Sequence, residues 1–150
     1  MATHEQLAIA EELLRPAYGH GLVVDDTLQF DGPTQPTMAE LETAIATASA
    51  HILSRRVYAE FARRIAAVIG RRRASVDSWL VELNTKRMDG GQLSAEEQQD
   101  RALILAFYAW EGLMIETRQA LIELADATFA DDAHWPPPPA GLTPEWLKGF

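Results

Sequence analysis

Residues 94–128 read SAEEQQDRALILAFYAWEGLMIETRQALIELADAT, and this stretch decides the fold. Ser94, followed by Glu97 three residues later, is typical of a capping box that starts a helix. A heptad-like repeat follows, with spacings of four and three, at Leu103, Phe107, Trp110, Met114, Thr117, Leu121, Leu124 and Thr128. Further apolar residues lie outside this repeat at Leu105, Tyr108, Leu113, Ile115 and Ile122. A helix that is apolar on more than one face is either central in a bundle or shared with a partner. Both alternatives are open for Phe107, Trp110, Met114 and Leu121.

Two more helices are expected upstream of this one. Thr37 and Glu40 form a second capping box, and apolar residues recur at helical spacing as far as Ile69. Nothing interrupts this pattern before Gly70, so a helix of about thirty residues is predicted. A third helix is expected from Ser75 to about Met88, where Asp89-Gly90-Gly91 supplies the glycine that helix ends favour.

The N-terminal part predicts a short helix and a hairpin. Thr3 and Gln6 form a capping box, and Pro16 is expected to stop the helix that follows. The runs 21–24 and 27–30 flank the polar pair Asp25-Asp26, which favours a β-hairpin. Because an isolated hairpin is only marginally stable in water, it is expected to lean on the body or to be extended by a partner.

The C-terminal part changes character at residue 133. Four consecutive prolines, at positions 136–139, impose an extended polyproline path, and Thr143-Pro144 starts one helical turn at most. Large apolar groups on this segment are expected to dock on the body or on another protein, together with the first prolines: Trp135, Pro136, Pro137, Trp146 and Phe150.

These patterns predict a mainly α protein, a helical bundle with long helices, a small N-terminal β-hairpin and an extended Pro-rich C-terminal tail. We expect one compact unit with three parts: a helix and hairpin at 1–36, a helical body at 37–130 and a docking tail at 131–150.

The charges are unevenly distributed. The chain has 13 Lys and Arg against 22 Asp and Glu, a net charge of −9, which disfavours a protein that coats nucleic acid with its whole surface. Residues 51–90 are nevertheless basic and lie between two acidic flanks. Their arginines form a basic stripe made of Arg55, Arg56, Arg63, Arg64, Arg71, Arg72 and Arg73. This stripe would bind phosphate or an acidic partner, or it is a solvated face paired with the acidic flanks. Aromatic residues for base stacking are sparse within it.

The sequence lacks the common motifs of enzymes and metal-binding proteins. The chain has no cysteine, no glycine-rich phosphate loop and no histidine pair at metal-ligand spacing. No catalytic, metal-binding or cofactor-binding residue is therefore predicted. No run of about eighteen apolar residues indicates a membrane span, and the first residues lack the pattern of a signal peptide.

The order of features resembles a known family. The residues concerned are Leu22–Phe30, Pro36-Thr37-Met38-Ala39-Glu40-Leu41, Leu93-Ser94-Ala95-Glu96-Glu97-Gln98, Trp110 with Arg118–Leu121, and Trp135–Pro139. In this order they are similar to the small tail accessory proteins of tailed bacteriophages, the tail assembly and tail fibre assembly chaperone-like families. These families usually carry an Asp-Trp step in an extended connection, whereas Asp77-Ser78-Trp79 lies in a predicted helix here.

The resemblance implies a non-enzymatic protein that binds other tail proteins of the fibre or baseplate. It would work in the virion tail, or in the host cytoplasm during assembly, without a cofactor and with self-association as an option. The helical Asp77-Ser78-Trp79 favours a permanent tail component over a transient chaperone. The alternative is a helical nucleic-acid-binding or regulatory protein that uses the arginines from Arg55 to Arg73.

Overall fold

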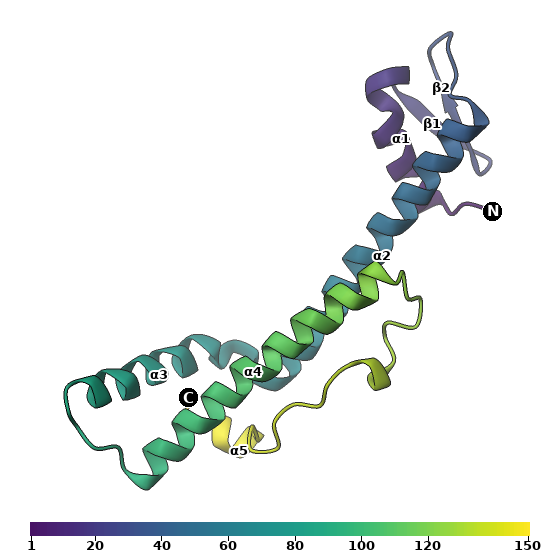
Figure 1. Ribbon diagram of the computed structural model, residues 1–150. Helices are drawn as coiled ribbons and strands as arrows, with labels where there is room; N and C mark the ends of the chain where they lie inside the picture. Colours follow the sequence, from purple (N-terminus) through teal and green to yellow (C-terminus); the bar gives the residue numbers. More distant parts are fainter. The chain divides into compact units, whose positions relative to one another are not determined.

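The computed structural model describes residues 1–150 and divides them into two compact units, Met1–Arg56 and Val57–Phe150. The fold is mainly helical with a two-stranded hairpin, as the sequence predicts (Figure 1). The elements in chain order are α1 His4–Tyr18, β1 Gly21–Val24, β2 Thr27–Phe30, α2 Met38–Ile69, η1 Gly70–Arg72, α3 Arg73–Met88, α4 Ala95–Glu123, η2 Asp132–His134 and α5 Pro144–Leu147. The boundary between the two units falls inside α2.

Helix α1 begins at the predicted capping box but passes through Pro16. The Thr3 hydroxyl accepts from the Gln6 N–H, and the Gln6 side chain accepts from the Thr3 N–H. The expected stop at Pro16 is wrong, since the helix continues to Tyr18 and ends at Gly19, whose φ of 78° is left-handed. Pro16 lies in the last turn, where its missing N–H removes one bond while the Gly19 N–H still reaches the Arg15 carbonyl at 2.9 Å.

The hairpin has the predicted strands and leans on α1. Asp25 and Asp26 both adopt positive φ, 47° and 58°, which matches the right-handed twist of the two strands. Leu28 and Phe30 of β2 point inward and are buried with residues of α1 and α2: Leu7, Ala10 and Ala44. The beginning of α2 therefore belongs to the same compact unit as the hairpin, and the predicted division after residue 36 falls at a loop within this unit. Two strands alone would have too little apolar surface to hold together.

Side chains occupy backbone groups on both outer edges of this small sheet, at the end where Gly21 pairs with Phe30. The buried Glu11 carboxylate accepts from the Gly21 N–H at 2.9 Å and is paired with Arg15. The hydrogen bonds from Arg15, and then from Gly21, lower the pKa of Glu11 below its usual value. On the other strand, the Gln35 amide accepts from the Phe30 N–H at 3.1 Å and donates to the Phe30 carbonyl at 2.7 Å. Gln35 thus bonds Phe30 as a neighbouring strand would.

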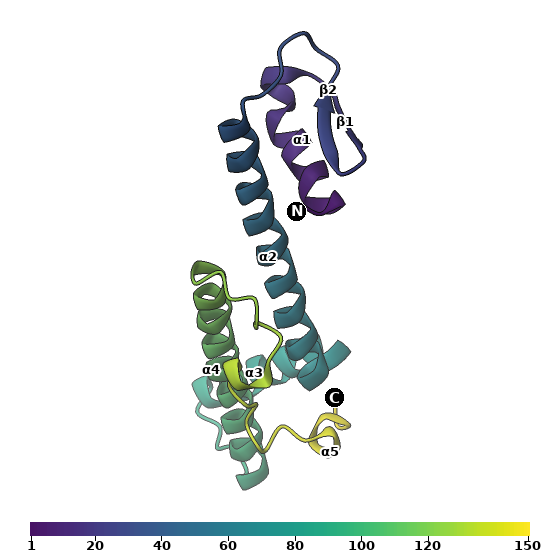
Figure 2. The ribbon, with the colours of Figure 1, turned by 90° about the vertical axis from the view of Figure 1, so that its right-hand side faces the viewer.

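The second unit contains the end of α2, the helices α3 and α4, and the C-terminal segment. Gly70 has a φ of 57°, which a residue with a side chain rarely adopts, and the chain turns there from α2 into η1 and α3. Helix α3 packs against α4, and the two views show α4 running beside both α3 and the end of α2 (Figures 1 and 2). The predicted third helix is confirmed, with a start two residues earlier, at Arg73.

Helix α4 ends earlier than the heptad repeat predicts. Its last residue is Glu123, and Ala125 follows with a left-handed φ of 49°. The Ala125 N–H bonds the Ile122 carbonyl and the Asp126 N–H bonds the Leu121 carbonyl, which is a Schellman closure. Leu124 is exposed, so the predicted seam does not extend to Leu124 and Thr128.

Candidate functional site

Helix α4 is held at its start by its own cap and by α3. The Ser94 hydroxyl accepts from the Glu97 N–H at 3.1 Å, and the Glu97 carboxylate accepts from the Ser94 N–H at 2.8 Å. Lys86 of α3 donates to the same carboxylate at 2.8 Å. The bond from Lys86 is the main reason why the pKa of Glu97 lies below its usual value, with the Ser94 N–H adding to it. One side chain thus joins the capping box to the neighbouring helix.

The inner face of α4 forms the core of the second unit. Phe107 and Met114 are fully buried, both at 0% exposure, and so is Ile104. Trp110 and Leu121 are buried beside them. Of the two alternatives for the heptad residues, the structure shows burial within the chain. The core register also starts at Ile104, whereas the repeat places it at Leu103, which is half-buried.

The start of the C-terminal segment docks on its own unit through Trp135 and through Trp110 of α4. Trp135 is buried, and its indole N–H donates to the Phe129 carbonyl at 2.7 Å. The Arg64 guanidinium lies over its ring, 5.3 Å from the centroid. The Trp110 indole N–H donates to the Pro136 carbonyl at 2.9 Å, so the proline run is fixed to α4 at its first residue. Pro137 is exposed.

The end of the segment is fixed through Asp100 of α4. The Trp146 indole N–H donates to one oxygen of this carboxylate at 2.8 Å, and the Trp79 indole of α3 donates to the other at 3.0 Å. The ring of Phe150 lies 4.8 Å from that of Trp146, and both residues are half-buried. Most of the apolar groups predicted to bind a partner are therefore used within the chain.

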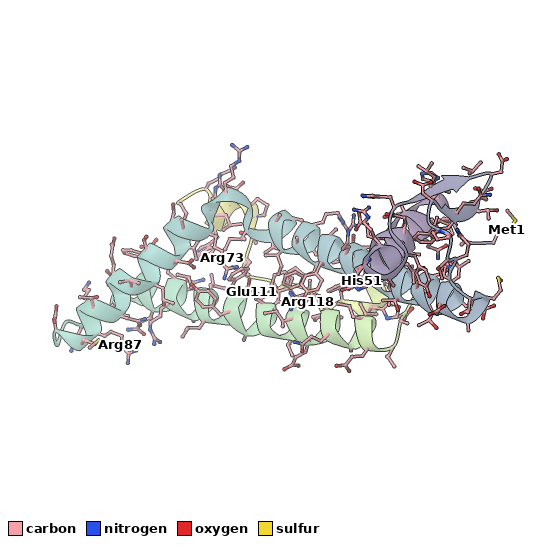
Figure 3. All side chains as sticks on the ribbon, turned by 90° about the horizontal axis from the view of Figure 1, so that it is seen from above. Met1, His51, Arg73, Arg87, Glu111 and Arg118 are labelled. Atoms are coloured by element: carbon pink, nitrogen blue, oxygen red, sulfur yellow. The ribbon has the colours of Figure 1, made fainter.

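A ladder of polar contacts runs along one edge of the helix pair. Its rungs join Asn84 to Arg101, Asp77 to Tyr108 and Arg73 to Glu111. From one rung to the next, the residue number in α3 falls by about as much as the residue number in α4 rises. The contacts therefore fix the antiparallel register of the two helices. Figure 3 shows Arg73 and Glu111 pointing toward one another, with Arg118 further along α4.

Two polar residues of α4, Tyr108 of this ladder and Arg118 beyond it, have unusual surroundings. Burial, and then the hydrogen bond to Asp77, raises the pKa of Tyr108 to about 12. The guanidinium of Arg118 lies over the rings of Tyr58 and Phe61 of α2, at 4.3 and 4.8 Å from the ring centroids. Its buried Nε has no hydrogen-bond partner. Aromatic packing therefore holds Arg118 in place of an ion pair.

The arginines of the basic stripe differ in whether they form ion pairs within the chain. Four have carboxylate partners within the chain: Arg56 with Glu5, Arg63 and Arg64 with Glu60, and Arg73 with Glu111. The bond from Arg63 is the main reason why the pKa of Glu60 is lowered. Arg55, Arg71 and Arg72 have no such partner. The stripe is thus no continuous charged face, and more than half of it is neutralised by the chain itself.

The outer face of α4, defined by Ala102, Leu105, Ala109, Gly112 and Leu113, is apolar and exposed. At about 100° per residue these positions lie on one side of the helix, opposite Phe107 and Met114. Leu105 is 41% exposed and Leu113 is 52% exposed. The heptad repeat does not include this face, because alanine and glycine contribute little to an apolar pattern. Leu105 and Leu113 are the residues from which the face could have been predicted.

The structure was also compared with what a metal site and a membrane-spanning helix require. No group of three or more His, Asp or Glu residues is arranged to hold a metal ion. No helix has both the length and the apolar composition needed to cross a bilayer. Comparisons with protein-family models, with curated proteins and with solved structures gave no match.

Proposed function

We propose that this protein acts without catalysis by binding another protein through the outer face of α4. The observation that carries this proposal is the continuous apolar strip from Ala102 to Leu113 that no part of the second unit covers. Covering exposed apolar area is favourable by about 25 cal/mol per Å². The small residues Ala109 and Gly112, between the two leucines, leave room for a close approach by a partner helix.

The resemblance in sequence supports a partner from a phage tail. We propose a tail accessory protein that contacts a fibre or baseplate protein, works in the virion tail or in the host cytoplasm during assembly, and needs no cofactor. Permanent incorporation agrees with a chain whose tryptophans already have partners in its own fold. The exposed strip then takes the role that the sequence suggests for Trp135 and Trp146.

The test is co-expression of this chain with the proteins encoded beside its gene. We expect one tail protein to copurify with the wild type and to be lost with Leu113→Glu, because a charge would then be buried in the interface. Val81→Glu is the matched control, since Val81 is an exposed apolar residue of another helix, α3. This variant should still copurify with the partner.

Equal losses for the two variants would contradict a role for the outer face. Gene neighbours without tail proteins, or tail proteins that never copurify, would contradict the phage assignment. Mass spectrometry of purified particles separates the two versions of the proposal, because a permanent component is found in the particle and a chaperone is missing from it.

A further inference from the structure

A cavity of about 500 Å³ lies between the end of α2, η1 and the C-terminal segment. It brings together two features that are far apart in sequence, the Arg71-Arg72 pair and the chain around Leu142 and Leu147. The lining includes apolar side chains from both sides, among them Ala66, Ile69 and Leu142. Arginine at the rim of an apolar hollow is a combination found at the centres of protein interfaces.

The two arginines at this cavity are free of carboxylates. Arg73, the next residue, is bonded to Glu111, whereas Arg71 and Arg72 have no ion-pair partner. No acidic residue lines the cavity. Glu145, on α5, is already paired with Lys148 at 2.7 Å. The cavity therefore carries uncompensated positive charge, although the net charge of the chain is −9.

We propose that this cavity binds an acidic segment of a partner protein. An apolar side chain of that segment enters between Ala66 and Leu142, and neighbouring carboxylates accept hydrogen bonds from Arg71 and Arg72. Arginine matches carboxylates because its planar fork donates two parallel bonds. The site lies apart from the outer face of α4 and does not depend on it.

An acidic peptide fits this cavity better than a nucleic acid does. Single-stranded nucleic acids need aromatic side chains on which bases stack, and no aromatic residue lines the cavity. A leucine or similar side chain uses the apolar lining, which a phosphate cannot.

A purely local role for the two arginines makes a different prediction. They follow the C-terminus of α2, where positive charge stabilises the helix dipole. If that were their whole role, their removal would lower thermal stability and leave ligand binding unchanged.

The test uses the full chain and fluorescence anisotropy at physiological ionic strength. The probe is a labelled peptide in which leucine alternates with glutamate, and the comparison peptide has glutamine in place of glutamate. We expect only the acidic peptide to bind, with an affinity that falls as salt is added. The double variant Arg71→Gln/Arg72→Gln should weaken binding roughly tenfold, because two charge-assisted contacts are lost.

Two control variants locate the site. Arg55→Gln/Arg87→Gln removes the same charge from two arginines that have no ion-pair partner and lie outside the cavity, and it should bind as the wild type does. Ala66→Phe fills the hollow from an exposed helix position and should weaken the acidic peptide while leaving the fold intact. Leu113→Glu should retain peptide binding. The peptide assay therefore gives a clear result even if the outer face of α4 binds no partner.

The proposal is overturned if neither peptide binds, if both bind equally, or if the two double variants lose affinity alike. It is also overturned if a labelled single-stranded DNA binds more tightly than the acidic peptide and loses affinity with Arg71→Gln/Arg72→Gln, because the cavity would then recognise nucleic acid.

Discussion

Met114 and Leu113 are neighbours in the sequence of α4 and have opposite surroundings. Met114 is fully buried against the rest of the second unit, while Leu113 is half exposed on the outer face. Both faces are apolar, so hydrophobicity alone does not separate core from surface in this helix. What separates them is coverage, since α2, α3 and the C-terminal segment supply surface for one face only. The uncovered face is where the chain has apolar area left for another molecule.

The inner face should show the largest effect on stability. Phe107→Ala removes a fully buried ring, and we expect the free energy of unfolding to fall by about 3–5 kcal/mol. Urea denaturation followed by circular dichroism measures this loss. A loss of less than about 1 kcal/mol would mean that the inner face is loosely packed. Phe107 and Leu113 would then no longer differ in their contribution to stability.

The edge between the two faces should show an intermediate effect that depends on pH. Tyr108→Phe loses the hydrogen bond to Asp77, which is worth about 1.5 kcal/mol at neutral pH. In the folded chain the pKa of Tyr108 is raised to about 12, whereas an unfolded tyrosine titrates near 10. The folded state therefore holds more protons between these values, and stability falls as pH rises through this window.

Urea midpoints measured at a series of alkaline pH values test this expectation. The wild type should lose stability more steeply than Tyr108→Phe between about pH 10 and 12. Tyr58→Phe is the matched control, because Tyr58 is exposed and its hydroxyl bonds no carboxylate. Equal slopes for the three proteins would show that Tyr108 is not held in the polar edge as described.

The outer face should show the smallest effect on stability. Leu113→Ala is expected to change the free energy of unfolding by no more than about 0.5 kcal/mol, since half of the side chain is already in water. The same urea titration gives the value. A loss comparable with that of Phe107→Ala would mean that the outer face is structural, and the proposed binding function would lose its main support.

Local signals in the sequence predicted most of the elements. The capping boxes at Thr3, Thr37 and Ser94 all form as expected, because a hydroxyl followed by a carboxylate or amide three residues later satisfies free N–H groups without help from the rest of the fold. The hairpin is likewise confirmed with its predicted strands. Each of these features depends on residues that are close together in the chain.

Features that depend on distant residues were predicted less well. The repeat assigned from Leu103 passes over Ile104, which is fully buried, because burial depends on which elements cover α4 and not on spacing along that helix alone. The end of α4 was missed because Ala125 adopts the left-handed conformation that usually calls for glycine. The Arg71-Arg72 cavity was not foreseen, because it forms only where η1 meets residues some seventy positions later.

The side chains of Glu11 and Gln35 have a consequence for how molecules of this protein meet at high concentration. Open strands invite the strands of other molecules to add to them, and a two-stranded sheet has two such borders. Here Glu11 occupies the N–H of Gly21, and Gln35 occupies both backbone groups of Phe30. A second hairpin would have to displace one of these side chains before it could pair with Gly21 or with Phe30. Glu11 and Gln35 thus block strand addition at this end of each border of the sheet.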